Sequence, residues 1–334
     1  MDKGASALRA AVIGVGYLGR LHAQKYAALD GVALAAVADA DPERARQVAA
    51  ELGTRPVDDF RVLLAGEIHL ASIVVPTERH FDVARACLEA GVHVLVEKPV
   101  TETLAQAQAL QELAERRGLI FQVGHLERFN PAFLSAREIV REPVFIESHR
   151  LAPFKPRGTD VAVTLDLMIH DIDLILDLVA SPVAEVRASG APVLTDEIDI
   201  GNARIEFENG CVANVTASRV SQKAMRKLRV FQPDAYVTVD TLEHRLTVAR
   251  REPGGGAAEG GLPIRVEERR FEKPDPLAAE IRDFVACVRE GRRPAVGGAE
   301  GRRALEVALA ITQAMNRRTP REAPRPNGSR RDDR

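Results

Sequence analysis

The sequence predicts an α/β protein in which a doubly wound parallel sheet is followed by an α+β domain with a largely antiparallel, open sheet. Residues 8–123 alternate short aliphatic runs with helical patterns, as parallel strands and their crossover helices do. After about residue 125 the runs instead alternate apolar and polar residues. A chain of 334 residues is also long for one domain.

These observations place the first domain at residues 1–124 and the second at 125–318. The remaining segment, 319–334, is rich in proline and arginine and lacks large apolar side chains. Such a segment cannot bury enough apolar surface to offset the entropy of ordering, so we expect a disordered tail.

Composition narrows the class of protein. The chain is 46% hydrophobic and 28% charged, with a net charge of -2, so it has no general basic field for nucleic acid. No apolar run approaches the ~20 residues of a membrane span, and the N-terminus has no signal-peptide pattern. Cys87, Cys211 and Cys287 lack metal-ligand spacing and indicate reduced, buried thiols. We therefore expect a cytoplasmic protein whose partners are small molecules.

The first domain has recognisable helix ends between its strands. Asp41 followed by Pro42 is a typical N-cap and first helical position, and Thr103 with Gln106 predicts a capping box. Gly118 ends the helix that follows Thr103. The strands are nearly continuous in apolar residues, as in sheets buried on both faces. They are LRAAVIG, VALAAVAD, LASIVVP, VHVLVEKP and LIFQVG.

The second domain combines a few helices with several strands of alternating polarity. Helices are expected at residues 131–140 and 163–178 and, towards the end, at 275–290 and 299–318. The glycine-rich segment 254–261 predicts a flexible hairpin loop. The strands are VFIESHRL, EVRASGAP, NARIEFENG, CVANVTASR, AYVTVD and HRLTVAR.

The segment GVGYLG, residues 14–19, follows the first strand and opens a helix, which is the context of a dinucleotide-binding Rossmann turn. Its glycines allow a tight turn and a close approach of the backbone to a pyrophosphate. Asp39 ends the second strand, where a carboxylate bonds the adenosine ribose and repels a 2'-phosphate, so NAD is expected rather than NADP. A sharp turn without a ligand is the alternative. The expected cofactor-binding residues here are Gly14, Gly16, Tyr17, Leu18, Gly19 and Asp39.

Polar residues also end two later strands of this sheet. Glu97 and Lys98 follow a buried strand, where a charged pair is costly unless it has a use or a salt-bridge partner. Lys98 could lower the pKa of a substrate hydroxyl or stabilise an alkoxide. Pro76, Thr77 and His80 follow another strand, and His80 is either a cofactor contact or structural. Because ligands bind at the carboxyl ends of parallel strands, we expect all five at the cofactor site.

The segment VTLDLMIHDIDLILDL, residues 163–178, is apolar except for one polar stripe and for Thr164 and Asp171. Asp166, His170, Asp173 and Asp177 lie on one face of a helix in a stripe roughly 60° wide. A mostly buried helix with such a stripe faces either solvent or a cleft. We expect Asp166 and His170 at the cleft, with the two later aspartates in structural contacts. A metal site at Asp166 and His170 would need further ligands that are not evident, so no metal is expected.

Four motifs together resemble one enzyme family. The glycine turn, PTERH, EKP and DLMIH occur in the order and spacing of the Gfo/Idh/MocA oxidoreductases, over residues 8 to about 318. The resemblance implies that Lys98 and His170 flank the nicotinamide and the reacting carbon, with Asp166 orienting His170 or bonding a substrate hydroxyl. It also implies a homodimer or homotetramer. Met168 stands where the family often has glycine, which predicts a regular helix and a narrower pocket.

The segment GHLERFNPAF crosses from the first domain into the second. It resembles the corresponding segment of family members that oxidise nucleotide-activated sugars such as UDP-N-acetylglucosamine, and so indicates the class of substrate. Arg128 there, with Arg150, Lys155 and Arg157 further on, could hold a diphosphate, or could be ordinary basic positions. Free sugars and inositols stay open. The expected substrate-binding residues are Arg128, Asn130, Arg157, Thr159, Asp166 and His170.

The expected function is an NAD-dependent oxidation of a sugar hydroxyl to a ketone, or the reverse. His170 would take the hydroxyl proton while hydride leaves the same carbon, and Lys98 would stabilise the oxyanion; with Asp166 these form the catalytic set. A non-catalytic NAD- or sugar-sensing regulator is the rival, as is an enzyme that recycles bound NAD during elimination or glycoside cleavage. Loss of Lys98 or His170 would favour the regulator, and both are present.

Overall fold

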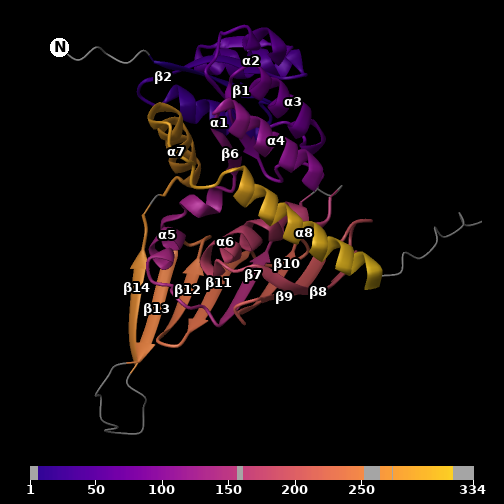
Figure 1. The fold of residues 1–334 in the computed structure, drawn as a ribbon, viewed down its shortest axis with the longest axis vertical. Coiled ribbons are helices and arrows are strands. Elements are labelled where there is room, and N and C mark those ends of the chain that lie inside the picture. Colours follow the sequence, from indigo (N-terminus) through magenta and orange to yellow (C-terminus); the bar gives the residue numbers. More distant parts are fainter. Residues whose placement is uncertain (1–6, 156–160, 252–263, 273, 319–334) are drawn as a thin grey trace, which may run out of the picture.

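A computed structural model describes residues 7–155, 161–251, 264–272 and 274–318 (Figure 1). Arg157, Thr159, the glycine-rich segment 254–261 and the tail 319–334 lie outside the described residues, so the predictions made for them are not compared with the structure.

The first sheet is parallel and doubly wound, as predicted, with the strand order β3-β2-β1-β4-β5-β6. One face carries α1, α2 and α7, and the other carries α3, α4 and the start of α8, so alternate residues of each strand enter different cores. The strands are β1 (Leu8–Ile13), β2 (Val32–Ala38), β3 (Arg55–Val57), β4 (Leu70–Ile73), β5 (His93–Glu97) and β6 (Phe121–Gly124). The helices are α1 (Tyr17–Ala27), α2 (Pro42–Leu52), α3 (Thr77–Glu89) and α4 (Leu104–Arg117), with a short 3-10 turn η1 (Phe60–Leu64).

The predicted helix ends of this domain are confirmed. The Asp41 side chain accepts hydrogen bonds from the backbone of the first turn of α2. Thr103 and Gln106 form a capping box at the start of α4, and Gly118 ends that helix with φ +63. These caps satisfy backbone groups that a helix end leaves unpaired, so the sequence fixes where the crossover helices begin and end.

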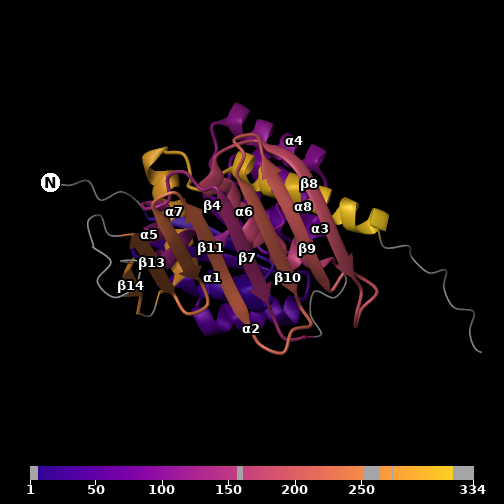
Figure 2. The ribbon, with the colours of Figure 1, turned by 90° about the horizontal axis from the view of Figure 1, so that it is seen from below.

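The second sheet has eight strands in the order β14-β13-β12-β11-β7-β10-β9-β8. Neighbouring strands are antiparallel except β7 and β10, which confirms a largely antiparallel sheet. Seen from below, the sheet presents strands with no helix in front of them (Figure 2), so it is open on that face. Its strands are β7 (Phe145–Leu151), β8 (Val183–Ala191), β9 (Ile200–Phe207), β10 (Val212–Ser218), β11 (Met225–Gln232), β12 (Ala235–Asp240), β13 (Arg245–Arg251) and β14 (Ile264–Arg270).

Helices cover the other face of this sheet. They are α5 (Pro131–Arg137), the π-helix η3 (Thr164–Met168), α6 (Ile169–Val179) and most of α8 (Gly298–Arg318). The other two helical segments, η2 (Leu126–Phe129) and α7 (Pro276–Glu290), contribute no residue to the core of this sheet. Residues of α5, α6 and α8 share one core with the inward side chains of the strands. Two strands of this sheet, β11 and β14, and the short β3 of the first sheet were not among those predicted.

The last two helices join the two domains. Leu277, Ile281 and Phe284 of α7 pack into the first domain's core, although the sequence grouped this helix with the second domain. In α8, Leu305 packs in the first core and Ile311 in the second. The C-terminal helices α7 and α8 therefore connect the two domains (Figure 1).

Two further expectations concern single features. Cys87, Cys211 and Cys287 are all buried and free, as predicted. Within the described residues, no helix combines the length and the apolar composition needed to cross a bilayer.

Candidate active site

The turn between β1 and α1 is shaped by its glycines. Gly14 has φ +87, and a Cβ there would lie 2.5 Å from the carbonyl oxygen of Val74. A Cβ on Gly19 would lie 1.8 Å from the carbonyl oxygen of Gly14. At Gly16, by contrast, nothing lies within 4 Å, so the backbone is open to a ligand. Two of the glycines are thus required by packing, and the third faces free space.

The start of α1 is suited to an anion. Its N-cap, Gly16, has no side chain that could cap the helix, and Gly16 lines the cavity, so the positive end of the helix dipole lies at the cavity. Tyr17 and Leu18 of this first turn also line the cavity, and Tyr17 is 75% exposed. The residues predicted from the glycine motif therefore surround one open site.

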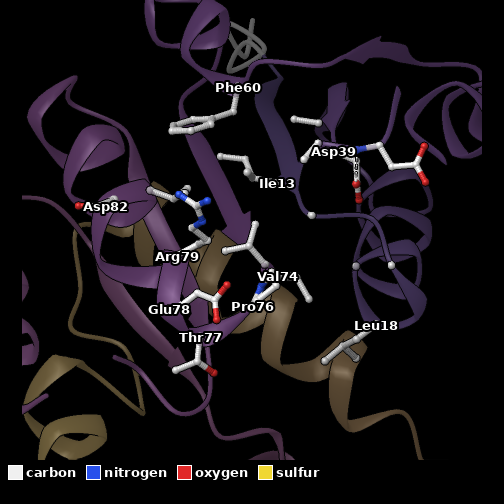
Figure 3. Close-up of a pocket in the computed structure, with 18 of the residues that line it drawn as sticks. Ile13, Leu18, Asp39, Phe60, Val74, Pro76, Thr77, Glu78, Arg79 and Asp82 are labelled. Atoms are coloured by element: carbon white, nitrogen blue, oxygen red, sulfur yellow. Dashed lines mark hydrogen bonds between the residues drawn. The ribbon is translucent and has the colours of Figure 1, made fainter. Parts of the chain in front are cut away.

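The cavity has a volume of about 1380 Å³ and runs from the glycine turn across the strand ends to the second domain (Figure 3). This exceeds the ~300–1,000 Å³ of sites for drug-sized ligands, as a dinucleotide requires. Its lining includes Pro76 and Thr77 after β4, and Lys98 after β5. From the second domain it includes Leu165 and Asp166.

Asp39 is fixed at the end of β2. Its Oδ2 atom accepts a hydrogen bond from the Val15 backbone at 2.8 Å, and its Oδ1 atom accepts one from the Asp41 backbone at 2.9 Å. The Nη1 atom of Arg44 lies 3.3 Å from Oδ1. Position 40, next to Asp39, is alanine, but α2 brings Arg44 to the same cavity. Arg44 was not among the cofactor-site residues expected from the sequence.

His80 is buried rather than exposed in the cavity. Its ring nitrogens each lie 2.9 Å from a backbone oxygen, one of Pro99 and one of Val75. Burial lowers the pKa of His80, while these two contacts act in the opposite direction. Of the two roles considered for His80, the structure shows the structural one, in which the ring ties together the loops that follow β4 and β5.

Lys98 and Asp166 meet across the domain boundary, as the sequence analysis expected. The Lys98 Nζ atom donates to the backbone oxygen of Asp166 at 2.7 Å and lies 3.5 Å from its Oδ1 atom. The side chains are 17% and 30% exposed, respectively, and both line the cavity. A cation and a carboxylate are thus held together where solvent is partly excluded.

The helix that carries Asp166 begins irregularly, so the prediction of a regular helix from Met168 is wrong. Thr164–Met168 forms a π-helix, and the Ile169 N–H donates to the Thr164 oxygen, five residues back. Met168 and Ile169 are both fully buried in the second core. The wider turn keeps both side chains in that core while Asp166 faces Lys98, and π-turns of this kind occur often at functional sites.

His170 lies one turn further along, at the start of α6, and is only partly exposed. Its Nδ1 atom is buried without a hydrogen-bond partner among the described residues, and His170 itself is not among the residues that line the cavity. Burial, followed by the charges of Lys98 and Arg150, holds the pKa of His170 well below its usual value. The imidazole is therefore neutral at neutral pH and free to accept a proton.

The later part of the polar stripe is structural, as expected, and it also holds Arg128. The guanidinium of Arg128 donates to Asp173 at 2.7 Å and contacts Asp177 at 2.6 Å, and the residue is 7% exposed. Two nearly buried carboxylates require such a partner. The structure thus places Arg128 below the cleft, away from the position predicted for a diphosphate ligand.

Two other predicted substrate contacts are also engaged inside the protein. Asn130 caps α5 through Oδ1 and donates to the Thr241 backbone, and it is 1% exposed. Arg150 is 3% exposed and binds Asp171 at 2.5 Å and Glu127 at 3.0 Å. Lys155 is exposed.

Arg226 was missed because it lies on β11, a strand that the sequence analysis did not predict. Its side chain is 46% exposed, and it lies 3.5 Å from Glu127. Its charge is among those that lower the pKa of His170. It is therefore a partly exposed cation beside the proposed base.

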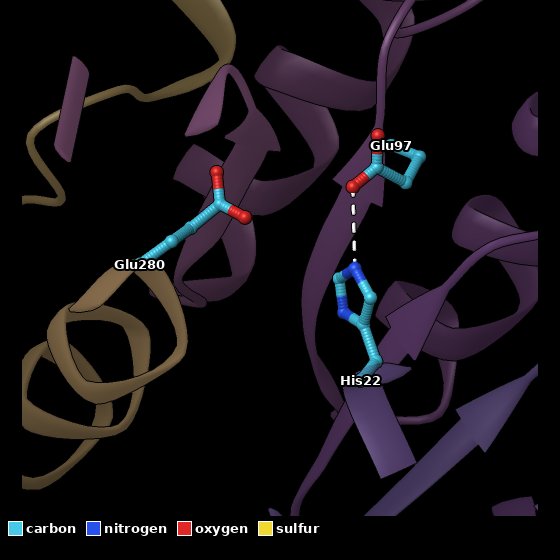
Figure 4. Close-up of side chains that lie close together, drawn as sticks. All are labelled: His22, Glu97 and Glu280. Carbon is cyan, nitrogen blue, oxygen red and sulfur yellow. Dashed lines mark hydrogen bonds and ion pairs between the residues drawn. The ribbon is translucent and has the colours of Figure 1, made fainter. Parts of the chain in front are cut away.

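Glu97 lies beneath Lys98 in a buried cluster and does not line the cavity with it. Its Oε1 atom lies 3.3 Å from His22 Nε2, and Glu280 of α7 points towards this pair (Figure 4). One ligand atom from each residue lies within 4.8 Å of the others, a spacing that could suit a metal. Glu280 is fully buried and has no hydrogen-bond partner among the described side chains. Burial and the Glu97 charge raise its pKa well above the usual value, so it holds a proton.

Family models match both domains. The model described as "Oxidoreductase family, NAD-binding Rossmann fold" matches residues 8–125, and the Gfo/Idh/MocA C-terminal domain matches residues 143–237. The chain belongs to the Gfo/Idh/MocA family. It is an NAD-binding oxidoreductase that acts on CH–OH groups, as the resemblance implied.

Named relatives of this Gfo/Idh/MocA protein cover nearly its whole length. The UDP-N-acetylglucosamine 3-dehydrogenase of Acidithiobacillus ferrooxidans is 44% identical over 92% of this chain and 97% of its own. A solved structure of the UDP-N-acetylglucosamine 3-dehydrogenase from the same organism has a TM-score of 0.86 at 42% sequence identity. The match covers 93% of this chain and 98% of that chain. The scyllo-inositol 2-dehydrogenase (NAD(+)) of Bacillus subtilis is 28% identical over 94% and 95%.

Proposed function

We propose that this enzyme oxidises the 3-hydroxyl of UDP-N-acetylglucosamine to a ketone with NAD, or catalyses the reverse reaction. The 44% identical relative from Acidithiobacillus ferrooxidans carries the choice of substrate. The contact between Lys98 and Asp166, with His170 one turn further along the same helical segment, supports the chemistry. These residues come from both domains, so the reacting carbon would lie between them.

Two side chains have separate roles in the reaction: His170 takes up a proton, and Lys98 stabilises negative charge. Bound NAD accepts the hydride at its nicotinamide ring. His170 would take the hydroxyl proton on Nε2, because its low pKa keeps the imidazole neutral and its other ring nitrogen, Nδ1, is buried. Lys98 stabilises the negative charge that develops on the substrate oxygen, and Asp166 keeps the ammonium in place.

The nicotinamide cofactor fits the glycine turn and Asp39. The open backbone at Gly16 would hold the pyrophosphate, and the carboxylate of Asp39 would bond the ribose hydroxyls. Pro76, Thr77 and Lys98 extend the cofactor site towards the second domain.

The substrate diphosphate needs cations other than the two internal arginines. Arg128 and Arg150 are held by buried carboxylates and cannot reach it without leaving those carboxylates unpaired. Arg157 and Thr159 remain candidates from the sequence, and we add Arg226, which is partly exposed beside His170. A homodimer or homotetramer, assembled through the open face of the second sheet, is part of the same proposal and is tested by light scattering.

Inositols are the second candidate substrate because the Bacillus subtilis relative is named for one. The test measures NADH formation with UDP-N-acetylglucosamine, free N-acetylglucosamine and inositols, each over a range of concentrations. We expect a much higher kcat/KM for the nucleotide sugar. Equal or better use of an inositol or free sugar would replace the nucleotide-sugar assignment. A sugar-dependent reaction without net NADH would indicate recycling of the cofactor.

A further inference from the structure

A second histidine lies beside His170, the proposed base, and has no role in the proposed reaction. His125 follows β6 at the domain junction and is 1% exposed. Neither of its ring nitrogens has a hydrogen-bond partner among the described residues. Buried polar atoms are normally paired, with protein or with water, so two unpaired nitrogens on one ring call for an explanation.

The ring of His125 lies beside the ring of His170. The two ring centroids lie 6.4 Å apart, and the planes are nearly perpendicular at 87°. The Nδ1 atom of His170 is the nitrogen that is buried and unpaired on this base. This spacing suits one hydrogen bond bridged by a single water, which serves nearly as well as a direct bond.

Charged groups surround both rings. His125 is influenced by Asp173 of α6, Arg128 of η2, and Glu97 and Lys98 at the end of β5. His170 is influenced by Lys98, by Arg150 of β7, by His125 and by Arg226 of β11. Burial lowers the pKa of His125, so the ring is neutral, while the carboxylates of Asp173 and Glu97 favour its protonated form. A neutral ring with carboxylates nearby can accept a proton.

The approach of Glu97 to this region depends on Gly124, the residue before His125. Glu97 and Gly124 are paired in neighbouring strands, and a Cβ on Gly124 would lie 2.8 Å from Glu97 Oε1. The absence of a side chain therefore lets the buried carboxylate lie against the strand end that carries His125.

We propose that His125 is a positioning residue for His170 that fixes its tautomer and receives the proton from its inner nitrogen. This inference rests on the proposed function. The substrate O–H bond breaks as His170 Nε2 gains the proton, and the Nδ1 proton then passes to a ring nitrogen of His125. Two electrons leave with the hydride for NAD, and none pass through the histidines. To accept on Nε2, neutral His170 must carry its proton on Nδ1, and His125 supplies the acceptor that selects this tautomer.

The first test measures tautomers by nitrogen NMR of histidine-labelled protein bound to NAD. The chain has 8 histidines, so the His170 signals are assigned with His170→Asn. We expect His170 to be protonated on Nδ1 in the wild type and to become a mixture of tautomers in His125→Phe. Protonation on Nε2 in the wild type, or an unchanged tautomer in His125→Phe, would overturn the proposal whether or not a sugar is turned over.

The second test measures turnover with whichever sugar reduces NAD. His125→Phe should lower kcat about tenfold or more, within the range of proton-transfer effects, with NAD affinity unchanged. His125→Asn, whose amide can accept and donate, should restore part of the rate. Because a neutral His125 that accepts from His170 Nδ1–H favours the protonated imidazole, the acid limb of kcat should move to lower pH in His125→Phe.

The matched control is His69→Gln, in a histidine that accepts a backbone hydrogen bond at the far end of β4, and it should retain the wild-type rate and pH profile. A purely structural His125 would give lower stability with an unchanged pH profile and no advantage of Asn over Phe, which would overturn the relay. If Lys98→Met also retains full activity, the proposed function itself fails. Loss with Lys98→Met but not with His125→Phe contradicts only this inference.

Discussion

The Nζ atom of Lys98 lies 2.7 Å from the backbone oxygen of Asp166, although the two residues come from different domains. Lys98 follows β5 of the first sheet, and Asp166 lies in the π-helix η3 that precedes α6 of the second domain. The C-terminal helices pack into both cores and hold these elements together. A single pair of residues thus marks where the cofactor domain and the substrate domain meet.

The preference for NAD should depend on Asp39 and, through it, on Arg44. Asp39→Ser removes the carboxylate that repels a 2'-phosphate and releases Arg44, now 3.3 Å from it, to bind that phosphate. We expect kcat/KM for NADP to rise relative to NAD by about tenfold, as for one charged hydrogen bond. The measurement compares the two cofactors in the wild type, Asp39→Ser and Asp39→Ser with Arg44→Ala. If the relative kcat/KM for NADP stays raised in Asp39→Ser with Arg44→Ala, Arg44 does not bind the 2'-phosphate. If the wild type already prefers NADP, Asp39 does not select NAD.

Arg128 should contribute to stability rather than to substrate affinity. Arg128→Ala leaves the carboxylates of Asp173 and Asp177 buried without their main partner, which should cost about 3–5 kcal/mol of unfolding free energy. Arg137→Ala is the matched control, since Arg137 pairs with the same Asp177 but is 56% exposed, and it should cost less than about 1 kcal/mol. Urea unfolding measures both. A stable Arg128→Ala variant with a raised KM for the nucleotide sugar would return Arg128 to the substrate site.

The neutral state of His170 predicts how activity depends on pH. Burial and neighbouring cations hold its pKa well below 6.5, so the base stays unprotonated in the free enzyme as pH falls through that value. Because kcat/KM reports groups of the free enzyme, its acid limb should lie well below pH 6.5. A limb at or above pH 6.5 that disappears in His170→Asn would show that the base has an ordinary or raised pKa.

Glu280 predicts a pH dependence of stability. Its pKa in the folded protein is raised well above 4.5, so the folded state binds the extra proton between pH 4.5 and the raised value. The contribution of Glu280 is therefore fully present below pH 4.5 and is lost as pH rises, by up to about 1.4 kcal/mol per pH unit. Glu280→Gln should gain stability over the wild type progressively as pH rises.

The same urea measurements at several pH values include Glu290→Gln, at the exposed end of the same helix, which should run parallel to the wild type. A Glu280→Gln difference that does not grow with pH would mean that Glu280 is ionised. If added divalent metal stabilises the wild type but not Glu280→Gln, the cluster with His22 and Glu97 binds a cation in place of the proton.

The sequence predicted well what depends on local pattern. The glycine turn, the caps at Asp41 and Thr103 and the aliphatic strands of the first sheet have signals within a few residues, because turns, caps and buried strands each restrict residue type. The strand β11 was missed because its sequence MRKLRVFQ places three cations on an alternating strand, which masks the apolar face. Its register with β7 buries Leu228 and Val230 nonetheless.

Partners distant in sequence were harder to foresee. Arg128 looked like a free cation because nothing near it in the chain shows that Asp173, 45 residues away, is its partner. The π-helix was missed because Met168 fits a regular helix equally well, and only its burial beside Ile169 requires the wider turn. His125 drew no attention because its relation to His170 exists only in the folded protein.

In the proposed sugar dehydrogenase, Lys98 stabilises the developing oxyanion. This role is tested by NADH formation from UDP-N-acetylglucosamine by the wild type and Lys98→Met. Methionine retains the length of the side chain and removes the charge that faces Asp166. We expect kcat of Lys98→Met to be about 100- to 1,000-fold lower than that of the wild type, as when one oxyanion donor is removed. The NAD affinity, measured by calorimetry, should stay unchanged. A Lys98→Met enzyme that turns over the nucleotide sugar at the wild-type rate would contradict this role of Lys98.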